Sequence, residues 1–186
     1  MREKYFAGVK HGRIALLFIL YMIVLIWVII FKCNVNDQLH IDRNLAMSLW
    51  DRFTLNLIPF HDFYVSLIKG ASLPHWLAFG FNIICCIPGG VLLGFFLDKA
   101  KGLWASFFFI LGIEVFQLFS GFGGFDPTDI FLNMLGVIIG YAIYDLVYEK
   151  MQYTTINKLC VVFNILATPI AAFAIINTYN NFPIPL

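Results

Sequence analysis

Residues 14–31 read IALLFILYMIVLIWVIIF, an apolar run that contains no charged residue. An α-helix rises about 1.5 Å per residue, so roughly 17–25 such residues cross the hydrocarbon core of a bilayer. Arg2, Lys4, Lys10 and Arg13 precede the run, as basic residues precede a secretory signal. The run is longer than a usual signal core, and no small-x-small cleavage pattern follows it. The sequence therefore predicts a retained membrane helix.

Four more apolar runs along the chain are long enough to cross a membrane. They cover residues 77–97, 103–119, 130–147 and 159–176. Over the whole chain 61% of residues are hydrophobic, 12% are charged and the mean hydropathy is +0.84. Such values are typical of polytopic membrane proteins. We therefore predict an all-α fold, in which residues 1–186 form one membrane domain with about five spanning helices.

Composition and motifs argue against several functional classes. A net charge of +1 leaves no broad basic surface for nucleic acid. The sequence has no Walker loop, dinucleotide fingerprint or nucleophile elbow, and its four cysteines lack zinc-site spacing. We expect no cofactor, no metal site and no catalytic residue, and the sequence favours a protein that is not an enzyme. Membrane lipids are the expected surroundings, and the sequence leaves the oligomeric state open.

The basic residues predict how the helices are oriented. Eight of the 12 Lys and Arg lie before the first apolar run, between the second and third, or between the fourth and fifth. The loop 120–129 and the tail 177–186 contain none. The positive-inside rule then predicts a cytoplasmic N-terminus and an extracytoplasmic C-terminus. The outer segment 32–76 holds four basic residues, which four aspartates balance.

The outer segment 32–76 also carries an amphipathic pattern. Apolar residues recur at i, i+3, i+4, i+7 and i+8, which is the spacing of one helix face: Phe60, Phe63, Tyr64, Leu67 and Ile68. Pro59 suits the start of a helix. The stripe from Phe60 to Ile68 is too short to cross a membrane, so we expect it to form an interfacial helix against the outer side of the bundle.

Polar residues gather where the predicted topology places the outer half of the bilayer. Several separate segments contribute to this set: Arg52, Asn56, Asn82, Glu114, Gln117, Asp126, Asp129 and Asn133. Glu114 and Gln117 are spaced i, i+3 and share a helix face. Asp129 and Asn133 share another face with Gly136 and Gly140, and two such glycines let a neighbouring helix approach closely. Asp145 is expected near the cytoplasmic end.

Structural roles compete with functional ones for these residues. Asp126-Pro127-Thr128-Asp129 is a good helix start, with Asp126 as the N-cap. Asn82 and Gln117 are suited to hydrogen bonds between helices, and we favour that role for Asn82. Glu114 is the residue that a structural role explains least, because an ionisable group within a span defaults to a functional hypothesis. It is either protonated or paired with a cation, for which Arg52 is the nearest candidate.

Five motifs in order resemble the VanZ-like family of small bacterial membrane proteins. They are Asn56-Leu57-Ile58-Pro59-Phe60, Asn82 with Pro88-Gly89-Gly90, Glu114-x-x-Gln117, Phe125-Asp126-x-x-Asp129, and Asn133-x-x-Gly136-x-x-x-Gly140. The resemblance covers about residues 50–145. The family pattern usually has an Arg three residues before the first Asp, whereas this chain has Gly123. Arg52 or Arg43 substitutes for that cation, or this chain has lost or altered the interaction.

The resemblance implies a multi-pass protein of the bacterial cell membrane with a role in resistance to teicoplanin and related lipoglycopeptides. We expect a non-enzymatic action at the outer leaflet, on a lipid headgroup, a lipid-linked wall precursor or the lipid tail of the drug. The alternatives are an integral-membrane enzyme acting on a lipid-linked precursor and a small transporter. In the purely structural alternative, these polar residues only form hydrogen bonds that hold the helices together.

Overall fold

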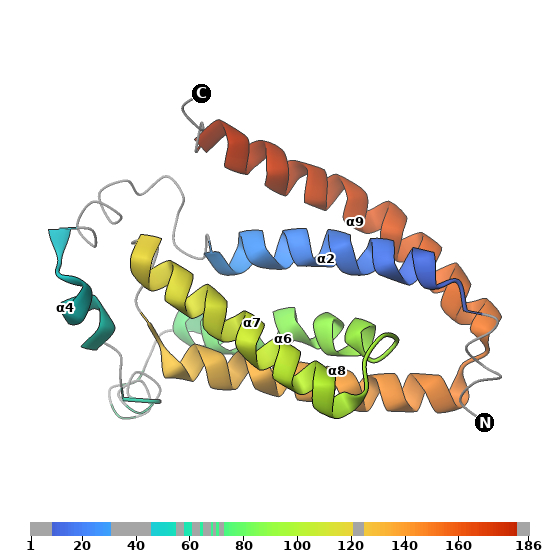
Figure 1. Cartoon of the computed structure of the whole chain (residues 1–186), viewed down its shortest axis with the longest axis horizontal. Coiled ribbons are helices and arrows are strands. Elements are labelled where there is room, and N and C mark those ends of the chain that lie inside the picture. The colour runs from blue at the N-terminus through green and yellow to red at the C-terminus, as the bar shows by residue number, and fades with distance from the viewer. Residues whose placement is uncertain are drawn as a thin grey trace.

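The computed structural model describes residues 9–30, 46–54, 58–60, 64, 68, 70, 73–120 and 125–181. These residues contain helices but no strand, which confirms the all-α prediction. Figure 1 shows the long helices lying lengthwise beside one another. The helices are α2 (His11–Ile30), α4 (Leu49–Thr54), α6 (Leu73–Leu93), α7 (Lys99–Ser120), α8 (Pro127–Lys150) and α9 (Tyr153–Asn181).

All five predicted membrane helices are present, with shifted bounds. Four contain stretches long and apolar enough to cross a membrane: His11–Val28, Lys99–Ser120, Pro127–Tyr148 and Tyr153–Asn177. The fifth, α6, has a shorter apolar stretch from Phe79 to Leu93. Its predicted last residues, 94–97, form the turn into α7. Helix formation therefore follows the apolar pattern, while the helix ends depend on turn residues.

The most extensive helix pair is α6 with α8. Glycines line the contact from both sides, because a methyl group on Gly136 would overlap the Ile83 carbonyl oxygen and one on Gly140 would overlap that of Ile87. On the opposite helix, a methyl group on Gly90 would overlap the Val137 carbonyl oxygen. The predicted close approach at Gly136 and Gly140 is thus confirmed, and its partner is α6.

Helix α2 packs against α9 and α6. Its Tyr21 hydroxyl donates a hydrogen bond of 2.9 Å to the Cys85 carbonyl of α6. Pro88 follows inside the same helix, where a proline removes a backbone donor and disturbs the preceding turn. Tyr21 therefore joins α2 to the turn of α6 that precedes the proline.

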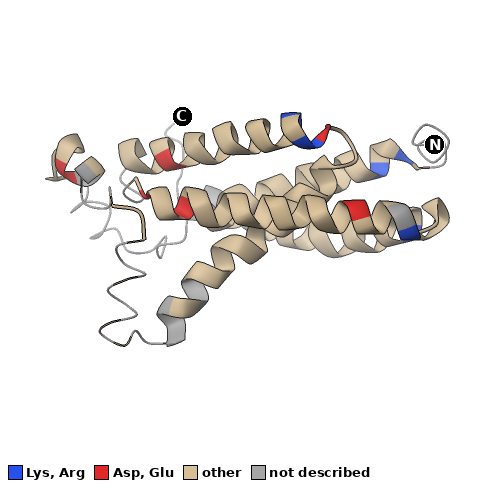
Figure 2. Ribbon diagram, turned by 90° about the horizontal axis from the view of Figure 1, so that it is seen from below, with Lys and Arg blue, Asp and Glu red and all other residues tan. Residues whose placement is uncertain are grey.

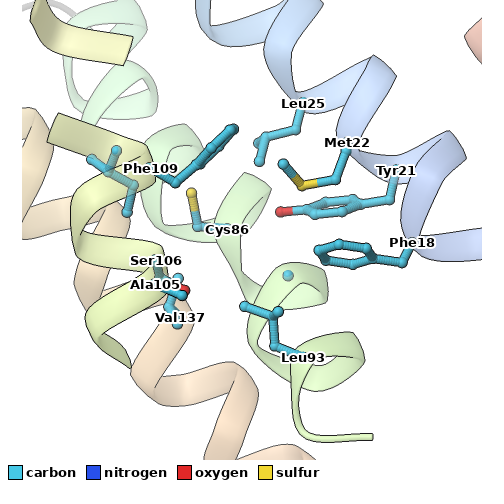
Figure 3. Close-up of a pocket in the computed structure, with 12 residues that line it drawn as sticks. Phe18, Tyr21, Met22, Leu25, Cys86, Leu93, Ala105, Ser106, Phe109 and Val137 are labelled. Carbon is cyan, nitrogen blue, oxygen red and sulfur yellow. The ribbon is translucent and has the colours of Figure 1, made fainter. Parts of the chain in front are cut away.

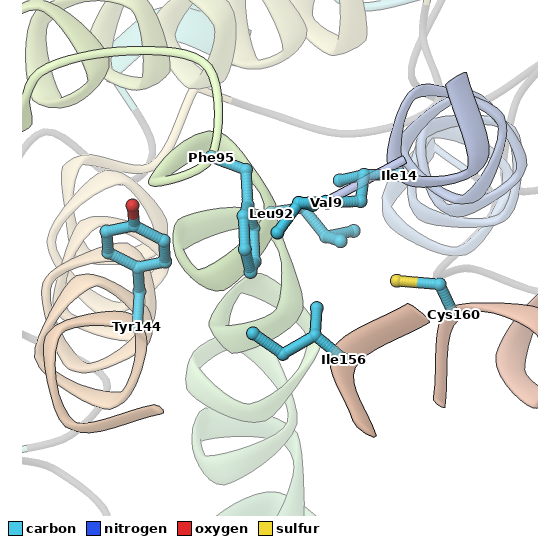
Figure 4. Packing of buried hydrophobic residues seen from close by; sticks show 7 residues of the cluster. All are labelled: Val9, Ile14, Leu92, Phe95, Tyr144, Ile156 and Cys160. Carbon is cyan, nitrogen blue, oxygen red and sulfur yellow. The ribbon is translucent and has the colours of Figure 1, made fainter. Parts of the chain in front are cut away.

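The two ends of the bundle differ in charge. Helices α2, α7 and α9 begin at one end of the bundle, where α8 also finishes, and we call it the basic end. It holds all six Lys and Arg side chains that the structure describes: Lys10, Arg13, Lys99, Lys101, Lys150 and Lys158. An apolar cluster that includes Ile14, Leu92, Phe95, Tyr144 and Cys160 closes this end (Figure 4). Glu114 lies in the last turns of α7, and Asp126 and Asp129 lie at the start of α8, so all three belong to the opposite end, which we call the polar end. Figure 2 shows the basic residues gathered away from this end.

Candidate functional site

The first turn of α8 organises the polar end. Asp126 is the N-cap, and its carboxylate accepts a hydrogen bond of 2.8 Å from the Thr128 amide. Pro127 occupies the first helical position, where a missing backbone N–H costs nothing. The predicted capping role of Asp126 is therefore confirmed. A carboxylate here also interacts favourably with the positive end of the helix dipole.

Glu114 joins α7 to this helix start. Its side chain is only 1% exposed, and its Oε2 accepts a hydrogen bond of 3.2 Å from the Asp126 amide. Gln117 lies one turn further along α7 and is also buried, as the shared helix face predicted. The Glu114 carboxyl thus contacts the backbone of the same residue whose side chain caps α8.

Two polar contacts join α6 to α8 beside this point. The Asn82 side-chain amide donates to the Asp129 carboxylate, so Asn82 makes the helix-to-helix hydrogen bond that we favoured for it. One turn deeper, the Cys86 thiol lies 3.5 Å from the Asn133 side-chain oxygen, which it can use as an acceptor. Asn133 is 1% exposed. The structure therefore brings Asn82, Asp129 and Asn133 onto one interface.

Phe60 departs from the predicted interfacial helix. Its φ of 61° is in the left-handed region, which a bulky residue rarely adopts. The Phe60 amide donates a hydrogen bond of 2.9 Å to the Thr128 hydroxyl, and the Phe60 ring lies 5.5 Å from that of Phe131. Phe60 therefore belongs to a turn docked on the start of α8. Its carbonyl accepts from the Tyr64 amide, and Tyr64 and Ile68 are helical and exposed.

Several predicted site positions lie outside the residues that the structure describes. They are Asn56, Gly123, Phe63, Leu67 and the side chain of Arg52. The helix that carries Arg52, α4, does pack against α7. Its Phe53 ring lies 5.4 Å from that of Phe125, immediately before the Asp126 cap. The proposed pairing of Arg52 with Glu114 therefore stays a prediction.

One cavity inside the bundle does not include Glu114 in its lining. This small apolar cavity of about 170 Å³ lies between α2, α6, α7 and α8, and Cys86, Ser106 and Val137 are among its lining residues (Figure 3). Only Cys86 connects it to the polar contacts, through Asn133. Among the described residues, no three His, Cys, Asp or Glu side chains are grouped for a metal ion. The arrangement suits hydrogen bonding and charge recognition.

Sequence reasoning missed two participants, Thr128 and Cys86. Thr128 was visible within the Asp-Pro-Thr-Asp helix start, but nothing local indicated that its hydroxyl would accept from Phe60, 68 residues away. Cys86 lies in an apolar run, where a cysteine usually behaves as a small apolar residue. Its spacing of four residues from Asn82 places both on one helix face, and that spacing was a usable signal.

Comparison with known proteins adds an independent observation. A family model described as VanZ/LLP1 matches residues 18–148. Protein VanZ of Enterococcus faecium is 27% identical over 151 residues, which cover 79% of this chain and 83% of that protein. No solved structure matches the chain. The matched range includes every predicted site residue, from Arg52 to Asn133.

Proposed function

This chain belongs to the VanZ/LLP1 family, and we propose that it lowers the susceptibility of its cell to teicoplanin-type lipoglycopeptides. The proposed action is non-enzymatic and takes place at the outer leaflet of a bacterial membrane. The polar end would bind a lipid headgroup, a lipid-linked wall precursor or the drug, and so reduce the drug's access to its target.

The observation that carries this proposal is the separation of the two ends of the bundle. Glu114, Asp126 and Asp129 lie toward one end, and the six described basic residues lie at the other. The positive-inside rule favours a cytoplasmic location for the basic end. The polar end would then face the outside, where lipid-linked wall precursors are exposed to these drugs.

Burial gives Glu114 and Asp129 different roles in this proposal. Glu114 is almost fully buried; it would hold the start of α8 in place through the Asp126 amide, and its negative charge would contribute to recognition at the polar end. Asp129 is partly exposed and would offer its carboxylate to a ligand while Asn82 orients it. Tyr64 and Ile68, which are 63% and 64% exposed, supply apolar surface for a lipid tail.

Expression in a susceptible bacterial host tests the proposal. The minimal inhibitory concentration of teicoplanin should rise with the wild-type chain and return to the empty-vector value with Asp129→Asn or Glu114→Gln. Asp145→Asn is the matched control, because Asp145 is an exposed carboxylate near the end of α8, at the basic end. Immunoblots of membranes must show equal abundance of all variants. Equal susceptibility of wild type and empty vector would refute the proposal.

A further inference from the structure

An apolar groove of about 540 Å³ lies between α2, α6, α8 and α9. All but one of its lining residues have hydrocarbon or sulfur side chains, and Leu17, Val91, Val147 and Ala167 represent the four helices. The exception is Tyr21, whose hydroxyl is directed to the Cys85 carbonyl. The volume lies within the roughly 300–1,000 Å³ that ligand pockets usually have.

The groove lies in the half of the bundle nearer the basic end. Its lining extends from Val24 and Ile170 to Met151, in the turn that joins α8 to α9. Helices α2, α8 and α9 contain stretches that are apolar enough to cross a membrane, and α6 has a shorter apolar stretch from Phe79 to Leu93, so most of the lining residues belong to apolar helix segments. Acyl chains are the apolar molecules that surround a protein there. A groove without exposed polar groups at this depth is complementary to such a chain.

Four basic residues lie next to groove-lining segments at the basic end. The Lys10 amide donates to the Asn157 side chain at 2.9 Å, and the Asn164 side chain donates to the Arg13 carbonyl at 3.0 Å. These two bonds hold the start of α2 against α9 on either side of Cys160, which lines the groove. Lys158 precedes lining residue Leu159 in the chain, and Lys150 precedes lining residue Met151. All four basic residues are exposed.

Acidic side chains at this end lie by another hollow. Asp98 and Asp145 line a space of about 210 Å³ formed by the α6–α7 turn and α8, and Asp98 pairs with Lys101 at 3.6 Å. The side chain of Glu149 lies outside the described residues. The charge beside the apolar groove is therefore mainly positive among the described side chains, which favours an anionic headgroup.

We propose that the groove binds one acyl chain of an anionic phospholipid, whose headgroup lies among Lys10, Arg13, Lys150 and Lys158. The acyl chain would be held by van der Waals packing, since the surrounding lipid is as apolar as the groove, and each basic side chain selects for the anion. This site is separate from Glu114 and Asp129, so it stands or falls independently of the function proposed above.

Native mass spectrometry of the detergent-solubilised full chain tests the site. Phosphatidylglycerol and phosphatidylcholine with identical acyl chains are titrated separately, and the bound fraction of each is measured. The wild type should retain phosphatidylglycerol preferentially. Arg13→Gln and Lys158→Gln should each weaken that binding by about fivefold. Equal binding of the two lipids would overturn the anionic selectivity and hence the proposal.

Substitutions that fill the groove distinguish lipid binding in the groove from lipid binding to the general lipid-facing surface. Ala167→Phe fills the groove, and Ala167→Leu is a milder version should the larger ring prevent folding. Ala172→Phe is the matched control, because Ala172 is exposed on the same helix and does not line the groove. Phosphatidylglycerol binding should be lost in both Ala167 variants and kept in Ala172→Phe. Unchanged lipid binding in the Ala167 variants would overturn the proposal. If these variants changed the fraction of dimer and left lipid binding unchanged, the groove would instead bind a second copy of the chain.

Discussion

Asn82 on α6 donates a side-chain hydrogen bond to Asp129 on α8, and a constant register continues from this pair along both helices. Cys86 meets Asn133 across the same 47-residue offset, and Gly90 then approaches the Val137 carbonyl. The two helices run in the same direction, and their interface changes from polar to glycine-lined as it leaves the polar end. Hydrogen bonds fix the register, and the glycines allow the close approach.

Asn82→Leu should destabilise the protein more than Asp129→Asn does. Leucine removes the donor and leaves the Asp129 carboxylate against an apolar side chain, a loss of about 1–3 kcal/mol in the free energy of unfolding. Asparagine at position 129 keeps a side-chain oxygen that can still accept from Asn82. Thermal unfolding in one detergent measures both. Equal transition temperatures for the two variants would contradict the role of this bond in stability.

Gly140→Val should be among the most destabilising single substitutions in the chain. The added side chain would overlap the Ile87 carbonyl and the Gly90 backbone, and overpacking of this kind costs about 1–3 kcal/mol. Gly112→Ala is the matched control, because nothing lies within 4 Å of a Cβ there. Alanine is also the better helix former, so this control should unfold at the wild-type temperature or above it. The comparison uses thermal unfolding and the yield of monodisperse protein.

Local patterns predicted the elements of this structure better than they predicted their partners. The apolar runs predicted five helices, and the Asp-Pro-Thr-Asp motif predicted the α8 cap, because both depend on residues close in sequence. Gly136 and Gly140 predicted a close helix contact but not that Gly90 lies opposite. The helix expected from Phe60 begins beyond it, because the bond from the Phe60 amide to Thr128 holds a turn that no local propensity favours.

Tyr21→Phe should lower the free energy of unfolding by about 1 kcal/mol, in keeping with hydrogen bonds between membrane helices. The substitution leaves the packing almost unchanged and removes only the donor to the Cys85 carbonyl. Tyr153→Phe makes the same chemical change at a residue that is 47% exposed, and it should have no measurable effect. Chemical denaturation in mixed micelles compares the two variants. A larger effect from Tyr153→Phe would show that Tyr21 does not support the helix beside Pro88.

The predicted orientation places Ser48 outside the cell and Gln152 in the cytoplasm. Both residues are exposed, and each can be replaced by cysteine in a Cys33→Ser background. A membrane-impermeant maleimide should label Ser48→Cys in intact cells and Gln152→Cys only after permeabilisation. The remaining cysteines are buried or partly buried within the helices, so background labelling should be low. The reverse labelling pattern would turn the polar end toward the cytoplasm and remove the basis of the proposed function.

Glu114→Gln and Glu114→Ala should separate recognition from helix fastening. Glutamine retains a side-chain oxygen that can accept from the Asp126 amide, so the start of α8 keeps its support and the protein should reach wild-type abundance. Alanine removes the acceptor and leaves a buried amide in need of a partner, which costs about 1–3 kcal/mol. We therefore expect the alanine variant to show reduced abundance and a lower unfolding temperature. If the carboxylate only fastens α7 to α8, the glutamine variant should protect cells against teicoplanin as well as the wild type does. If its charge contributes to recognition, the glutamine variant should fold normally and lose protection, and that combination is the result we predict.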